Sequence, residues 1–180
     1  MYVVTKTDRV REIAELPQSS IGAPCPMILV GENSLRIAYY LEDREEVWDG
    51  TTVRLLSPDQ GDEPCAIVEF IMPYAHMFGP PNDEAFGGHP LAERGLRPYG
   101  AFEVEGSSWL SALERMNSVH PYHRPERFKK YRHFVLSFHD TTFECIAEGF
   151  TLTACRGTVE AALRKPNMRP NTSFERTREG

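Results

Sequence analysis

The sequence predicts an α+β fold based on a mainly antiparallel, curved sheet, a sandwich or half-barrel of about seven strands, with three to five short helices. Short segments of alternating apolar and polar residues follow one another, and turn-forming residues separate them as in hairpins. Helical periodicity is confined to a few short stretches. The 180 residues suffice for one hydrophobic core, and neither a repeat nor a linker divides them. We therefore expect one globular domain over residues 1–166.

The clearest strand signal is the segment 133–139, His-Phe-Val-Leu-Ser-Phe-His. Successive side chains of a strand point to opposite faces of a sheet. Phe134, Leu136 and Phe138 therefore share one face, which we expect to be buried. The opposite face carries His133, Val135, Ser137 and His139, so that face is where chemistry is expected.

The first part of the chain predicts one helix and two hairpins. A helix is expected over residues 8–16, because Asp8 can cap it and apolar residues recur at helical spacing, and Pro17 ends it. The hairpins pair residues 27–30 with 35–42 and residues 51–56 with 65–72, and turn formers connect each pair.

The segment 73–99 has no regular period, apart from a short helix expected over residues 90–94. Long irregular segments inside compact domains are uncommon and often functional. This one keeps several aromatic residues, so we expect it to pack against the body of the protein and to carry function. The elements expected after it are a strand over 100–105 and helices over 109–117, 125–130 and 157–163.

The apolar residues of the segment 143–155 change parity at Glu148-Gly149. Phe143 and Cys145 occupy odd positions, whereas Phe150 and Leu152 occupy even ones. One extra residue in a β-bulge produces such a change, and glycine is a usual site for it. We therefore predict one long bulged strand, whose continuous apolar face packs with that of residues 133–139 at the centre of the core.

Composition narrows the class of protein and its partners. A hydrophobic content of 41% and a charged content of 26% are typical of a soluble globular protein. The apolar runs are too short to cross a membrane and the N-terminus lacks signal-peptide features, so we expect a cytoplasmic protein. The net charge of −6 argues against nucleic-acid binding. The polar segment 167–180 is expected to be disordered, and free thiols are expected at Cys25, Cys65, Cys145 and Cys155.

The first candidate site consists of His139, Asp140 and Glu144. If a two-residue turn occupies Thr141-Thr142, His139 faces Glu144 across a hairpin. A carboxylate beside an imidazole raises its pKa and orients it, which suits a general base in catalysis. The alternative is a cross-strand pair that only stabilises the hairpin.

The second candidate site is a metal site of His120, His123 and His133. The helix expected between His123 and His133 is about 9 Å long, which is short enough to return the chain near its start. Three histidines suit an open divalent-metal site. The alternative is that these histidines cap helices or bind loop backbone.

The third candidate site is a binding surface on the segment 73–99, with Trp48 in an acidic loop as a further contact residue. The side chains that this site comprises are His76, Asn82, Asp83 and His89. Backbone N–H groups of Gly87-Gly88-His89 could also bind an anion.

Two functions follow from these sites. The first is a cytoplasmic domain that binds a small molecule or a protein, with the segment 73–99 as its functional loop. The second is a small hydrolase or lyase that uses His with Asp or Glu, with a divalent metal as a possible cofactor. Signature motifs of serine hydrolases, phosphate-binding loops and dinucleotide-binding folds are absent from the sequence. A homodimer formed through an exposed sheet edge is a further expectation.

Overall fold

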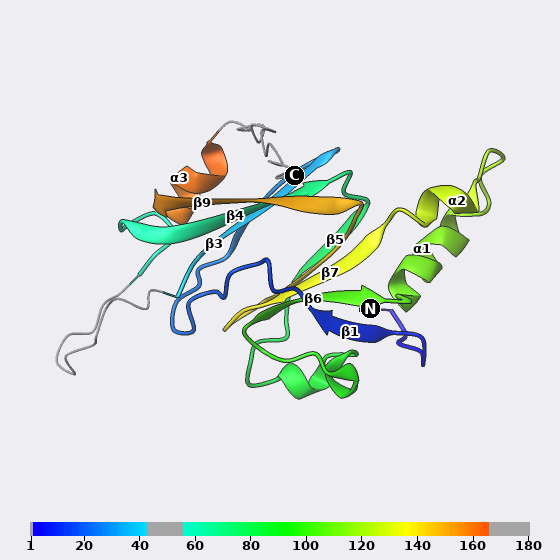
Figure 1. The fold of residues 1–180 in the computed structure, drawn as a ribbon, viewed down its shortest axis with the longest axis horizontal. Coiled ribbons are helices and arrows are strands. Elements are labelled where there is room, and N and C mark those ends of the chain that lie inside the picture. The colour runs from blue at the N-terminus through cyan, green and yellow to red at the C-terminus, as the bar shows by residue number, and fades with distance from the viewer. Residues whose placement is uncertain (1, 43–55, 166–180) are drawn as a thin grey trace, which may run out of the picture.

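A computed structural model describes residues 2–42 and 56–165 of the chain. It contains two antiparallel sheets (Figure 1). The five-stranded sheet has the order β1 (Arg9–Glu12), β6 (Gly100–Glu105), β7 (Arg132–Ser137), β8 (Thr142–Ala147), β5 (Ala75–Gly79). The four-stranded sheet has the order β2 (Met27–Gly31), β3 (Ser34–Tyr40), β4 (Glu63–Ile71), β9 (Gly149–Gly157).

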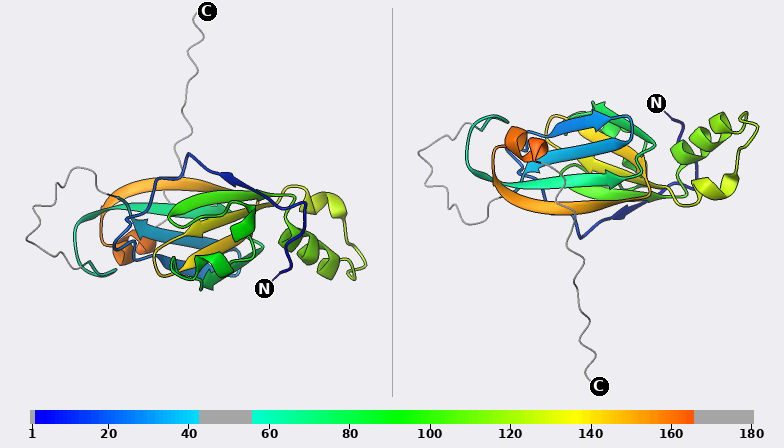
Figure 2. Two further views of the ribbon diagram at one scale, coloured as in Figure 1. Left: turned by 90° about the horizontal axis from the view of Figure 1, so that it is seen from below. Right: turned by 90° about the horizontal axis from the view of Figure 1, so that it is seen from above.

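The helices are few and short. They are α1 (Ser108–Asn117), α2 (Pro125–Phe128), α3 (Val159–Arg164) and the 3-10 turns η1 (Phe86–Gly88) and η2 (Ala92–Arg94). The α1–α2 hairpin projects from one end of the two sheets, and α3 lies at the other end (Figures 1 and 2). No helix in the described ranges is long and apolar enough to cross a membrane.

The predicted class is confirmed in its main feature, a largely antiparallel sheet with few helices. The described residues form nine strands rather than about seven, and these strands are divided between two sheets that do not close into a barrel. Residues 51–55 of one predicted hairpin, and the tail 167–180, lie outside the described residues.

The core lies between the two sheets and contains the apolar face predicted for the segment 133–139. Phe134, Leu136 and Phe138 are buried, with exposed fractions of 0%, 2% and 1%. They belong to one cluster with side chains of the facing sheet, including Leu35, Ile37, Tyr39, Val68 and Phe70. The alternation of β7 therefore sorts its side chains as expected.

The prediction of a helix over residues 8–16 is wrong. Residues 9–12 form β1, in which Val10 lies opposite Val104 of β6. Val10 packs against the cluster on the outer face of the sheet. Pairing with a neighbouring strand has outweighed a weak local preference for helix.

The prediction of one long strand over residues 143–155 is also wrong. These residues belong to two strands, β8 and β9, which lie in different sheets. The parity changes at Glu148-Gly149 as predicted, but the chain bends there and crosses to the other sheet. Between β4 and β5 the chain also passes from one sheet to the other, at the same corner. There the Glu148 N–H donates to the Ile71 carbonyl at 2.9 Å. Phe150 packs against the core, whereas Leu152, on edge strand β9, is 38% exposed.

The outer face of the five-stranded sheet is covered by a second apolar layer. Phe86, Leu91 and Leu96 of the segment 73–99 pack there against Phe102, Val104 and Val135, together with Tyr2 and Val4 from the N-terminal segment. The segment 73–99 is thus packed against the body of the protein, and it contains β5 and two 3-10 turns.

Candidate functional site

A buried polar cluster lies on the outer face of β7 and β8. The alternation of the two strands places His133 and Glu144 on this face, opposite to the core. The register sets Ile146 opposite His133 and Val135 opposite Glu144. His133 and Glu144 are therefore diagonal neighbours, which long side chains can bridge.

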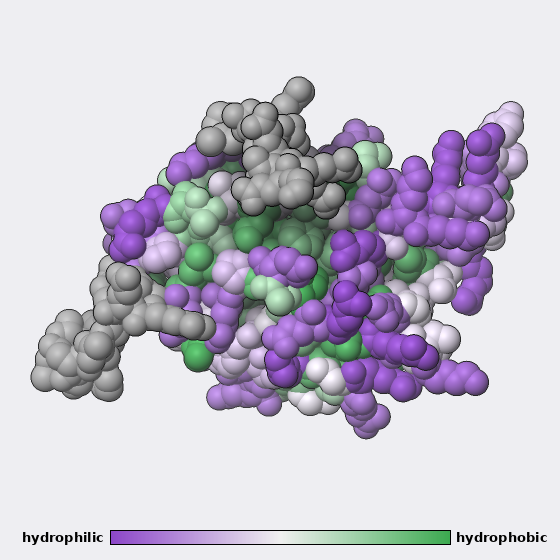
Figure 3. All heavy atoms as spheres, viewed as in Figure 1, coloured by the Kyte–Doolittle hydropathy of each residue, from purple (hydrophilic) through white to green (hydrophobic). Residues whose placement is uncertain are grey.

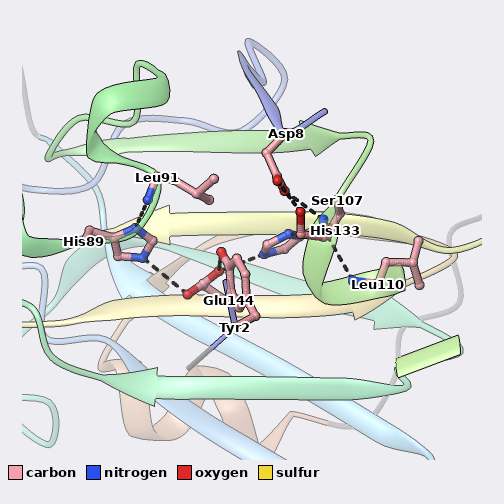
Figure 4. Close-up of polar contacts among 9 residues, drawn as sticks. Tyr2, Asp8, His89, Leu91, Ser107, Leu110, His133 and Glu144 are labelled. Carbon is pink, nitrogen blue, oxygen red and sulfur yellow. Dashed lines mark hydrogen bonds and ion pairs between the residues drawn. The ribbon is translucent and has the colours of Figure 1, made fainter. Parts of the chain in front are cut away.

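Three donors converge on the Glu144 carboxylate (Figure 4). Oε2 accepts from the Tyr2 hydroxyl at 2.7 Å and lies 2.8 Å from His133 Nε2, while Oε1 lies 3.2 Å from His89 Nε2. The side chains of Glu144, His133 and His89 are 7%, 0% and 2% exposed. Segments far apart in the chain, the N-terminal segment, the 73–99 segment and β7, therefore meet at one carboxylate.

The neighbours of the two imidazoles indicate where their protons lie. The Leu91 N–H donates to His89 Nδ1 at 3.1 Å, so the ring proton of His89 is on Nε2. Ser107 Oγ accepts from the Leu110 N–H at 3.1 Å and lies 2.9 Å from His133 Nδ1. The Ser107 hydroxyl can therefore donate to His133 Nδ1, while His133 Nε2–H donates to Glu144.

This arrangement keeps Glu144 ionised. Burial by itself raises the pKa of a carboxyl group, but hydrogen bonds from His133, His89 and Tyr2 outweigh burial and lower the pKa of Glu144 to about 2. Burial and the negative charge of Glu144 raise the pKa of the Tyr2 hydroxyl, which stays protonated. The cluster thus contains an ionised carboxylate that accepts hydrogen bonds from three side chains.

A second buried carboxylate, Asp8, holds the N-terminal end of α1 beside this cluster. It accepts from the Ser108 N–H at 2.8 Å, from the Ser108 hydroxyl, and from the Thr5 N–H at 2.7 Å. Burial opposes its ionisation, but these hydrogen bonds lower the pKa of Asp8. Trp109, in the first turn of α1, stacks on Tyr2 with ring centroids 5.6 Å apart. Asp8 and Trp109 therefore fix α1 relative to the buried cluster.

A cleft of about 620 Å³ lies between the α1–α2 hairpin and the ends of β6 and β7. Ser107 contributes to its wall and His133 lies directly behind Ser107, so the buried cluster reaches the cleft through Ser107. Leu110 and Phe128 supply apolar surface, and the polar residues lining it include Glu103, Glu105, Glu114, Lys129 and Arg132. A cleft of this size can hold a small molecule.

No protein-family model, no curated protein and no solved structure matches this chain.

The structure separates the first candidate set. The two-residue turn is His139-Asp140 rather than Thr141-Thr142, so His139 does not face Glu144. His139 Nδ1 lies 2.9 Å from Asp140 Oδ1, and this hydrogen bond raises the pKa of His139. Asp83 lies beside this pair: its N–H donates to the His139 carbonyl at 2.9 Å, and its carboxylate accepts from the hydroxyl of Tyr99. His139, Asp140 and Asp83 thus form a surface group distinct from Glu144.

The three histidines of the predicted metal site do not assemble. His133 belongs to the buried cluster, His123 Nδ1 lies 3.0 Å from Asn117 Oδ1, and His120 Nδ1 accepts from the Tyr122 N–H at 3.1 Å. The part of the chain that the structure describes holds no group of three or more His, Cys, Asp or Glu residues suited to a metal ion. The four cysteines are free thiols.

The predicted binding set is also dispersed. His76 is exposed on edge strand β5, Asn82 Oδ1 accepts from the Ala85 N–H at 3.0 Å, and His89 belongs to the buried cluster. Trp48 lies outside the described residues.

Tyr2 and Ser107 belong to the site but were not predicted from the sequence to do so. The Gly106-Ser107-Ser108 step before an amphipathic helix indicates an N-cap, and Ser107 is that cap. Its second contact, with His133, depends on β6 lying beside β7. No local pattern marks Tyr2, because its contact with Glu144 spans 142 positions of the chain.

Proposed function

We propose that this chain is a binding domain whose ligand is a small amphipathic molecule held in the cleft beside α1 and α2. The observation that carries the proposal is the cleft itself, whose volume of about 620 Å³ lies within the range of roughly 300–1,000 Å³ common for small-molecule sites. An apolar wall with a few polar groups at its rim is the usual construction of such sites.

The charges around the cleft favour a ligand that carries both signs of charge. Arg132 is engaged by Glu103, with Nε 2.8 Å from Oε1, and Glu105 lies 3.3 Å from Arg11. Two other charges then remain for a ligand. Within the described part of the chain, Glu114 has one ionisable partner within 4.0 Å, His123 at 3.8 Å, and Lys129 makes no ion pair.

An apolar amino acid or a short apolar peptide meets these requirements. Its amine would lie at Glu114, its carboxylate at Lys129, and its side chain against Leu110 and Phe128.

Within this proposal the segment 73–99 is functional because it supports the cleft from behind. His89 binds Glu144, Glu144 binds His133, and His133 contacts Ser107 in the cleft wall. The same segment presents Asp83 beside His139 as a second contact surface.

The test is an NMR titration with three probes of similar size: L-phenylalanine, phenethylamine and 3-phenylpropionate. The expected result is tightest binding of L-phenylalanine, with shifts of amide signals in residues 103–114 and 125–133. Ser111→Trp, which fills the cleft, abolishes these shifts, whereas Ala112→Trp, at the neighbouring exposed position outside the cleft, preserves them. Shifts that persist in Ser111→Trp would refute the cleft as the site.

One observation favours a second function, hydrolysis of an ester or another acyl compound. Ser107 Oγ, His133 and Glu144 form a relay with distances of 2.9 Å and 2.8 Å, and its serine end borders the cleft. In this scheme the Ser107 hydroxyl attacks the acyl carbon while its proton passes to His133 Nδ1. The imidazolium protonates the leaving alcohol, and water then releases the acid.

Hydrolysis can be tested apart from folding. Ser107→Asn keeps an N-cap acceptor but removes the nucleophile. Turnover of p-nitrophenyl acetate, and labelling of Ser107 by a fluorophosphonate detected by peptide mass spectrometry, are expected for the unaltered chain and not for Ser107→Asn. Turnover that survives in a folded Ser107→Asn chain would exclude Ser107 as the nucleophile.

A further inference from the structure

The tip of the α1–α2 hairpin contains a second, smaller pocket of about 200 Å³. Its lining residues are Asn117, His120, Tyr122, Arg124, Arg127 and Phe128. The hairpin projects away from both sheets (Figure 2), and its surface is strongly hydrophilic (Figure 3). The pocket is smaller than the roughly 300 Å³ at which whole drug-sized ligands are held, so it suits one chemical group of a ligand.

The pocket is held in shape by aromatic packing and backbone turns. Phe128 is buried, and its ring lies 5.4 Å from that of Tyr74 and 5.8 Å from that of His123. The Tyr122 N–H donates to His120 Nδ1 at 3.1 Å, which places the ring proton of His120 on Nε2. The pocket therefore has a fixed apolar side and a free imidazole N–H donor.

The pocket carries two arginines, Arg124 and Arg127. The Arg127 N–H donates to the Arg124 carbonyl at 3.1 Å, so the two residues belong to one turn of the chain. Neither guanidinium forms an ion pair with a carboxylate of the described residues, and Glu126, the acidic residue of α2, does not line the pocket.

Most of the other arginines in the described ranges have a carboxylate partner, the exceptions being Arg9, Arg94 and Arg115. Those within 4.0 Å of one are Arg11, Arg36, Arg97, Arg132, Arg156 and Arg164. Two neighbouring like charges without such a partner destabilise the chain that carries them. An anion bound between Arg124 and Arg127 would remove this repulsion.

We propose that this pocket binds the phosphate group of a small phosphate monoester. Two guanidinium groups and an imidazole N–H offer more donors than a carboxylate can accept, and they match the three terminal oxygens of a phosphate. The ring of Phe128 provides an apolar surface for the part of the ligand next to the phosphate. The site shares Phe128 with the cleft but none of its charged residues, so it does not depend on the function proposed above.

The experiment is a calorimetric and NMR titration of the full chain with phenyl phosphate, with benzoate at equal ionic strength as the carboxylate comparison. Phenyl phosphate is expected to bind more tightly and to shift amide signals of residues 117–128. Arg127→Gln is expected to weaken binding about tenfold, through loss of a charge-assisted hydrogen bond. Lys130→Gln removes an equal charge one turn away, outside the pocket, and is expected to leave binding within about twofold.

Three results would overturn the proposal. The first is the same loss of affinity in Arg127→Gln and Lys130→Gln, which would indicate binding to net charge alone. The second is equal affinity for benzoate and phenyl phosphate. The third is binding to vesicles containing phosphatidic acid without binding of phenyl phosphate, which would assign the surface to lipid headgroups instead of a small molecule.

Discussion

Replacing Glu144 by glutamine tests the buried cluster directly. The carboxylate accepts from three donors, whereas an amide offers one acceptor oxygen and turns an NH₂ group toward donors. The pKa of Glu144 is about 2 in the folded protein against an ordinary value of 4.5. Since each pKa unit is worth about 1.4 kcal/mol, ionised Glu144 contributes about 3 kcal/mol to the free energy of unfolding.

The sign of this contribution sets its dependence on pH. The pKa of Glu144 is lower in the folded chain, so the stabilisation is fully present above about pH 4.5. It is lost as the pH falls through 4.5 toward 2, where the folded protein also takes up the proton. Glu144→Gln lacks this titration, so the stability difference between the two chains should narrow from about 3 kcal/mol at pH 7 to near zero at pH 2.

Urea unfolding followed by tryptophan fluorescence, at several pH values between 2 and 7, measures this difference. Glu93→Gln is the matched control: Glu93 is exposed in η2, and its replacement is expected to change the stability by less than about 0.5 kcal/mol. The reasoning is refuted if Glu144→Gln is as stable as the unaltered chain at pH 7, or if the difference between them does not change with pH.

Three further predictions concern other parts of the fold. Tyr2→Phe removes one donor from the buried carboxylate and should lower the free energy of unfolding by about 1.5–3 kcal/mol in urea; an unchanged midpoint would place the N-terminal segment elsewhere. Phe150→Ala should cost about 2–4 kcal/mol, whereas Leu152→Ala, at the exposed edge, should cost less than about 1 kcal/mol by the same measurement; equal costs would contradict the sheet crossing. The hydrogen bond from Tyr99 to Asp83 raises the pKa of the Tyr99 hydroxyl to about 12, so Asp83→Asn should lower that pKa toward 10 in an ultraviolet titration, with Tyr99→Phe assigning the signal.

The faces of strands were predictable from alternation in the sequence, although the sequence did not show that both faces of β7 are buried. β7 alternates strictly, and its buried side chains Phe134, Leu136 and Phe138 follow from that alternation. β1 was not predictable, because four residues rich in arginine have no strong preference of their own and take a strand conformation from pairing with β6.

The passage of the chain from β8 in one sheet to β9 in the other could not be predicted from the local sequence. A change of parity at Glu148-Gly149 follows equally from a bulge within one sheet and from a bend that carries the strand into a second sheet. The bend is recognisable only when β4 and β5 are known to cross at the same corner, beside Ile71. That information lies in a segment some 75 residues earlier, so a window of sequence around Glu148 cannot contain it.

Which residue of β7 Glu144 meets depends on the position of the hairpin turn between β7 and β8, and residue preferences partly predict that position. Placing the turn at Thr141-Thr142 puts Glu144 opposite His139, whereas the turn at His139-Asp140 puts it opposite Val135. The two alternatives differ by four residues along β7, about 13 Å. An even shift keeps a side chain on its face, so Glu144 remains on the histidine face but moves from the His139 end to the His133 end. Threonine favours strands and aspartate favours turns, so residue preference alone favours the register that brings Glu144 to His133.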